Sequence, residues 1–224
     1  WGERRMKHPR TEAGKLAESA LVSLQSAMAA GGPDSPEADG LRSELDAVWR
    51  AASLAEQEVL DGLSADLYML SGEELPPPDL PVRPVEELES SLHAAGRRSD
   101  TTTVLSLLRD PAVQGLLGGL AKTARMRGWA YHAAGYPWAA VAFCDYAADE
   151  ANDEEARGLA LLALARAAPE LALARIASIE LAADAPSLRL AYAAVALEAM
   201  SPPSESAAEH AWNTRVGSLG KRAL

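Results

Sequence analysis

The sequence predicts an all-α protein, and three observations favour this fold class. Apolar residues make up 48% of the 224 residues but aromatic residues only 5%, so alanine and leucine dominate the apolar content. Alanine has the highest helix propensity, and its small side chain lets neighbouring helices approach closely. No segment shows the strict alternation of apolar and polar residues that is typical of a half-buried strand. Turn-forming residues also recur at a fixed interval in the second half of the chain, as expected of helical repeats.

The first predicted element is a helical hairpin in residues 1–75, which begins with a basic tail. Apolar residues recur at helical spacing over residues 11–30, and a turn rich in glycine and proline ends this helix. A nearly continuous apolar stripe then predicts one long second helix over residues 36–70. Because the connection between the two helices is short, we expect them to pack as a long antiparallel hairpin. The sequence leaves open whether the second helix also packs on another chain.

A proline-rich linker follows at residues 76–84. This segment contains five prolines, and because proline lacks a backbone N–H group the segment can form neither a helix nor a central strand. We therefore place the main domain boundary here. Beyond it, three short helices are predicted to start at the acidic residues after Pro84, at Asp100 or a neighbouring serine or threonine, and at Asp110.

A period of 34 residues runs through the second half of the chain. Gly135, Pro169 and Pro203 are each separated by 34 residues, at places where a turn would separate two helices. The same interval separates a set of alanines and a further pair of turn residues: Ala140, Ala174 and Ala208, and Asn152 and Pro186. This is the length of a tetratricopeptide repeat, in which two antiparallel helices form each unit.

Residues 121–154 resemble a tetratricopeptide unit most closely. Four positions match the pattern of the family: Gly128, Tyr131, Ala140 and Ala147. Three positions depart from it, since Ala124 replaces an early tryptophan, Cys144 a large aromatic residue and Asn152 the terminal proline. The resemblance therefore covers both helices of this unit, with its aromatic residues displaced.

The next two units are more degenerate. They span residues 155–188 and 189–222, and the resemblance implies a short TPR-like α-solenoid over residues 85–224 that is clearest at 121–222. Terminal repeats are often atypical because they cap the stack. Counting backward places residues 87–120 in the same phase, as a repeat-like segment. A generic helical bundle with accidental spacing is the alternative interpretation.

The resemblance implies a non-catalytic scaffold or assembly subunit that binds a partner peptide or helix in a concave groove. The first helix of each unit lines this groove in the family. Carried over by position, the lining residues are Lys122, Arg125, Trp129 and His132 from the first unit, Arg166 from the second, and Leu197 and Met200 from the third. A basic and aromatic patch in a chain of net charge −11 suits an acidic or C-terminal peptide. Alternatively, Trp129 packs between helices and the cations are solvated.

Catalysis, metal binding and nucleic-acid binding are all disfavoured. Cys144 and His132 occur near Asp145, as a thiol nucleophile would require, but Cys144 falls at a buried position of a second helix. The other histidines lack paired ligand spacing, and the acidic run at residues 149–155 lacks the glycine and regular oxygen spacing of a calcium loop. The net negative charge repels nucleic-acid phosphates. We predict no catalytic, cofactor-binding or metal-binding residue.

A single cysteine and the lack of any apolar run of ~18 residues favour a cytoplasmic protein. Two other hypotheses stay open. Basic residues close behind Trp1 also suit the soluble portion of a membrane-anchored subunit, whose membrane association would depend on an upstream segment. The other hypothesis is a helical enzyme with a pocket between the hairpin and the repeats.

Overall fold

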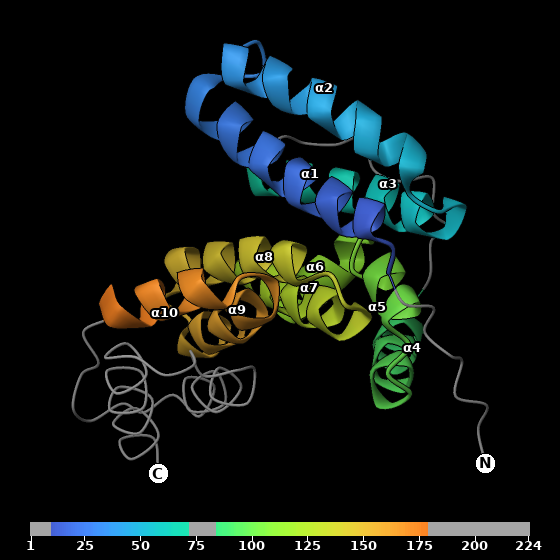
Figure 1. Ribbon diagram of the computed structural model, residues 1–224. Helices are drawn as coiled ribbons and strands as arrows, with labels where there is room; N and C mark the ends of the chain where they lie inside the picture. The colour runs from blue at the N-terminus through green and yellow to red at the C-terminus, as the bar shows by residue number, and fades with distance from the viewer. Residues whose placement is uncertain (1–9, 72–83, 179–224) are drawn as a thin grey trace, which may run out of the picture. The chain divides into compact units, whose positions relative to one another are not determined.

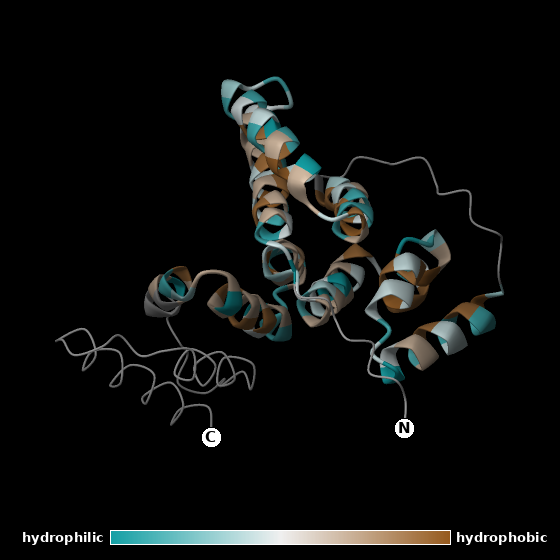
Figure 2. Cartoon of the chain, turned by 45° about the vertical axis from the view of Figure 1, so that its right-hand side comes forward, coloured by the Kyte–Doolittle hydropathy of each residue, from teal (hydrophilic) through white to brown (hydrophobic). Residues whose placement is uncertain are grey.

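The computed structural model describes residues 10–71 and 84–178 of the chain (Figure 1). Every regular element in these two ranges is a helix, so the prediction of an all-α protein is confirmed for them. Colouring by hydropathy shows apolar and polar residues mixed along each helix, with none apolar throughout (Figure 2). The chain divides into two units, Trp1–Leu75 and Pro76–Leu224.

The first unit contains three α-helices and a short 3-10 turn. They are α1 (Glu12–Gly31), α2 (Pro36–Ala51), α3 (Leu54–Tyr68) and η1 (Met69–Ser71). Helix α1 contacts both α2 and α3, and α1 and α2 run antiparallel (Figure 1). The buried apolar residues of this unit lie mainly on α1 and α3: Ala17, Leu21, Leu24, Ala27, Leu60, Leu63 and Leu67.

The prediction of one long helix over residues 36–70 is wrong, because helix α2 ends at Ala51 and a separate helix, α3, begins at Leu54. Ser53 lies between the two helices with an extended backbone (φ −65°, ψ 153°). Its Oγ accepts a hydrogen bond from the Glu56 N–H at 3.3 Å, and the Glu56 carboxylate accepts one from the Ser53 N–H at 3.0 Å. This reciprocal capping box starts a new helix. The apolar stripe runs through the break because both helices carry apolar residues at helical spacing.

Glu56 also binds the start of α1. The Thr11 N–H donates to Glu56 Oε1 at 2.8 Å, and the Thr11 hydroxyl donates to Oε2 at 2.7 Å. Thr11 is itself the N-cap of α1 and accepts a hydrogen bond from the Gly14 N–H. A Cβ atom at Gly14 would overlap the Glu56 carboxylate, so only glycine allows this close approach. One buried carboxylate therefore joins the N-termini of α1 and α3.

Opposing effects set the pKa of Glu56. Burial raises this pKa, but the hydrogen bonds from Ser53 and Thr11 outweigh burial and lower it from 4.5 to about 2. The charged form is therefore the one that the folded state stabilises.

Replacing Glu56 by glutamine should destabilise the first unit in a pH-dependent manner. Because folding lowers the pKa of Glu56, its contribution to stability is complete above pH 4.5 and is lost as the pH falls towards 2. We expect Glu56→Gln to lose about 3 kcal/mol of unfolding free energy near neutral pH and less than half of that at about pH 3. Urea unfolding followed by circular dichroism at the two pH values measures both losses.

The matched control is Glu58→Gln, which neutralises an exposed carboxylate on the same helix. It should change the unfolding free energy by less than about 0.5 kcal/mol at either pH. An equal loss at both pH values for Glu56→Gln would contradict the role given to this carboxylate.

The described part of the second unit contains seven helices. They are α4 (Val85–Arg97), α5 (Thr101–Leu107), α6 (Pro111–Leu117), α7 (Leu120–Ala134), α8 (Pro137–Ala151), α9 (Glu154–Ala167) and α10 (Pro169–Ser178). Asp100 and Asp110 are the N-caps of α5 and α6, as predicted, and accept hydrogen bonds from Thr103 N–H and Ala112 N–H.

Helices α7 to α10 pack in chain order. Helix α7 contacts α8, α8 contacts α9, α9 contacts α10, and α7 also contacts α9 (Figure 1). Gly135 (φ 88°) and Asn152 (φ 50°) end α7 and α8 in the left-handed conformation, and Pro169 begins α10, so these predicted turn positions are confirmed. Pro186 and the predicted third unit, residues 189–222, lie outside the described residues.

Helices α7 and α8 approach closely at Gly128. A Cβ atom there would overlap Cys144 Sγ and lie 3.2 Å from the Ala140 carbonyl oxygen. Tyr131, one turn further along α7, is fully buried and stacks on Phe143 with ring centroids 5.5 Å apart. The two helices therefore meet through small residues at one level and stacked rings at the next.

A buried arginine joins α7 to the preceding helices. Arg127 is fully buried, and its Nη2 donates a hydrogen bond to the Leu108 carbonyl oxygen at 2.7 Å. Its guanidinium carbon lies 5.9 Å from the centre of the Phe143 ring. This side chain thereby fixes the end of α5 against α7.

Replacing Gly128 by alanine should destabilise the second unit, because the added methyl group has no space between α7 and α8. We expect a loss of about 1–3 kcal/mol, as for other overpacked helix contacts. In the matched Gly96→Ala variant the new methyl group meets no atom within 4 Å, so helix propensity should raise stability by about 0.5–1 kcal/mol. Thermal unfolding of both variants measures these opposite shifts, and a Gly128→Ala protein as stable as the parent would contradict the close contact.

Candidate functional site

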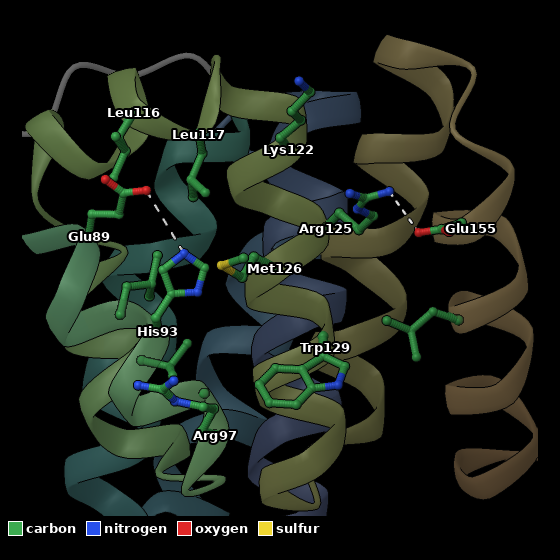
Figure 3. A pocket seen from close by; sticks show the side chains of 14 residues that line it. Glu89, His93, Arg97, Leu116, Leu117, Lys122, Arg125, Met126, Trp129 and Glu155 are labelled. Carbon is green, nitrogen blue, oxygen red and sulfur yellow. Dashed lines mark hydrogen bonds and ion pairs between the residues drawn. The ribbon is translucent and has the colours of Figure 1, made fainter.

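An open groove of about 660 Å³ lies within the second unit. Helices α4 and α7 form its two long sides, and residues of α5, α6 and α9 complete it. Figure 3 shows α4 and α7 running in the same direction along the groove, from Glu89 to Arg97 and from Lys122 to Trp129. The seven-residue separation on α7 spans about 10 Å, or two helical turns.

Apolar side chains form the floor of the groove. Leu92, Val104 and Leu159 are buried, whereas Met126 and Trp129 are half-buried. Figure 3 shows the Met126 and Trp129 side chains reaching from α7 towards α4. On α6, Leu116 is 37% exposed at the wall of the groove together with Leu117. The groove therefore leaves apolar surface of several helices open to a ligand.

Charged side chains form the rim. Arg97 and Lys122 are exposed, and neither forms an ion pair with any residue in the ranges that the structure describes. His93 Nε2 lies 3.9 Å from Glu89 Oε1 on the same helix, and both side chains are largely exposed (Figure 3). The groove thus offers two cations that have no acidic partner among the described residues, in a chain whose net charge is −11.

Arg125, also on the rim, has two acidic partners from the start of α9. Its Nη1 lies 2.9 Å from Glu155 Oε2 and 3.1 Å from Asp153 Oδ2. Figure 3 shows the first of these ion pairs reaching across from α7 to α9. Arg125 is therefore already paired with acidic side chains within the described residues.

Three of the five predicted partner-binding residues line the groove: Lys122, Arg125 and Trp129. The other two do not, since His132 is half-buried in the last turn of α7 and Arg166 is exposed near the end of α9. Leu197 and Met200 lie outside the described residues. Sequence reasoning did not find the side of the groove that α4 and α6 supply. The signal that could have indicated this side is the 34-residue period, because counting it backward places residues 87–120, which include most of α4 and all of α6, in the same repeat phase.

The described residues hold no group of three or more histidine, cysteine or acidic side chains that could bind a metal ion. Cys144 is fully buried against α7. Burial raises the pKa of its thiol to about 12, and the nearby negative charges of Asp145 and Asp153 act in the same direction. The thiol therefore stays protonated and serves packing, as predicted. None of the described helices is both long enough and apolar enough to cross a membrane.

Comparisons of the chain with protein-family models, with curated proteins and with solved structures find no match. The geometry and chemistry of the groove are thus the basis for a functional proposal.

The Cys144 thiol should be inert in the folded protein. It is the sole cysteine of the sequence, so a thiol reagent reports on this one site. Because the thiol is buried and its pKa is raised to about 12, we expect no reaction with Ellman's reagent in buffer and complete reaction in guanidinium chloride. Reaction of the native protein at the rate of a free thiol would show that α7 and α8 separate readily.

Proposed function

We propose that this protein is a non-catalytic interaction subunit that holds a segment of a partner protein in the groove between α4 and α7. The observation that carries this proposal is an open groove with an apolar floor and with two exposed cations on its rim, Arg97 and Lys122, that form no ion pair within the described ranges. Exposed apolar surface in a groove is stabilised when a partner covers it, by about 25 cal/mol per Å². A half-buried tryptophan on such a surface is a typical binding hot spot.

A short tetratricopeptide-like α-solenoid is the architecture we propose for α7 to α10. The contact of Gly128 with Ala140 and Cys144 supports it, because these residues stand at the first-helix glycine, the second-helix alanine and the aromatic position of the family. The contact between α7 and α9 also supports it, since first helices of successive units are neighbours in a solenoid. In this architecture the groove lies on the face of the solenoid that the first helix of each repeat unit forms.

The partner segment that fits best is an amphipathic helix with acidic flanks. The floor extends for about two helical turns along α7, a length that accommodates apolar side chains at positions i, i+3 or i+4, and i+7 of a bound helix. Arg97 and Lys122 lie towards opposite ends of the groove (Figure 3). Carboxylates that flank the apolar stripe would meet these two cations. The acidic balance of the chain disfavours nucleic acid as a partner.

Panning a phage-displayed library of random peptides on the full-length protein tests this proposal. We expect the enriched peptides to combine leucine-like residues at helical spacing with acidic residues. Trp129→Ala should weaken their binding about tenfold in fluorescence anisotropy, because it removes the aromatic anchor.

The matched control is Arg166→Glu, which reverses an exposed cation of the same unit that does not line the groove. It should leave the affinity unchanged. Failure to enrich any peptide, or equal binding by Trp129→Ala and the parent, would exclude the groove as the interaction site.

A further inference from the structure

The two carboxylates that contact Arg125 are held in different ways. Asp153 is the N-cap of α9, where its Oδ1 accepts a hydrogen bond from the Ala156 N–H at 3.0 Å, and its side chain is 17% exposed. Glu155 has a side chain that is 69% exposed, and its hydrogen bond to Arg125 is the one interaction that it forms with the described residues besides helix backbone bonds. Asp153 is thus fixed by the helix that it caps, whereas Glu155 can turn into solvent.

Release of Glu155 costs little, because an ion pair between exposed side chains contributes little to stability. Both carboxylates approach the same atom of Arg125, Nη1. A guanidinium group has five N–H donors in a planar fork and binds a carboxylate best through two parallel hydrogen bonds. Nη1 has two N–H groups, so a carboxylate that binds through Nη1 and Nη2 replaces Glu155 and can leave Asp153 in place.

Arg125 also stands at the right place to receive a partner. It lies three residues after Lys122 and four residues before Trp129 on α7, and all three line the groove. Residues at these spacings share one face of a helix. A bound helix that covers Trp129 would therefore bring its flanking acidic residues close to Arg125.

We infer that the Arg125–Glu155 ion pair is an exchangeable contact, in which a carboxylate of the bound segment replaces Glu155 on Arg125 and so selects acidic partners. This inference rests on the proposed binding function of the groove. Glu155 acts as an internal competitor: it neutralises Arg125 in the free protein and repels acidic ligands until it is displaced. A basic ligand gains nothing from the exchange.

Three labelled peptides of about 16 residues, long enough to form helix, test the inference with the full-length protein. They share one leucine stripe and carry glutamate, glutamine or lysine at the flanking positions. We expect the glutamate peptide to bind tightest in fluorescence anisotropy. Glu155→Gln should strengthen its binding about threefold and leave the glutamine peptide unchanged, since one exposed competing charge has been removed.

A double-mutant cycle assigns this gain to Arg125. In an Arg125→Gln background, Glu155→Gln should give no gain, and the preference for the glutamate peptide should shrink. Glu154→Gln is the matched control, because it removes the same charge from the neighbouring exposed position of α9, which does not line the groove. It should have no effect on either peptide.

The outcomes separate the inference from the function on which it rests. If no peptide binds, the groove function itself fails. If the peptides bind but Glu155→Gln changes nothing, or gives the same gain in the Arg125→Gln background, the exchange is wrong while the groove function stands. If Glu154→Gln and Glu155→Gln strengthen binding of the glutamate peptide equally, the lower net negative charge of the protein explains the gain. That result would also overturn the exchange.

Discussion

The groove depends on the close approach of α7 to α8 at Gly128. Because glycine has no Cβ, Cys144 and the Ala140 carbonyl group can lie against the α7 backbone. Tyr131 then stacks on Phe143, and buried Arg127 fixes α7 to the end of α5. These contacts use one side of α7 and leave its other side open. Residues three or four positions apart share a helix face, so the groove residues of α7 also lie together.

The first unit depends on a polar contact instead of a steric one. Glu56 accepts hydrogen bonds from Thr11 and Ser53, which cap α1 and α3. A buried carboxylate is tolerated because these donors compensate for the water that it loses. Gly14 leaves the space for it. The hydrogen bonds between Thr11 and Glu56 join residues that are 45 positions apart in the sequence, and they therefore fix how the N-termini of α1 and α3 meet.

Local chemistry explains which parts of the fold the sequence predicted. Prolines, glycines and aspartates mark helix ends through their own backbone preferences, so the starts of α5 and α6 and the ends of α7 and α8 were predictable. The break at Ser53 was also encoded locally, as a capping box, but the apolar stripe that runs through it favoured one long helix. For the candidate site, the resemblance to a tetratricopeptide unit implied Lys122, Arg125 and Trp129 by position. The acidic partners of Arg125 and the wall from α4 depend on tertiary contacts, which no local pattern specifies.

Occupation of the groove between α4 and α7 by a partner segment, as we propose, can be tested directly. Met126 lies in the groove between Arg125 and Trp129, so a photo-crosslinking amino acid in its place samples the bound segment directly (Figure 3). After irradiation in extract from the native source, we expect crosslinks to one segment rich in acidic and leucine-like residues. The same amino acid in place of Arg166, outside the groove, should give none of these products. Crosslinks within this chain alone, or identical products from both positions, would contradict the account.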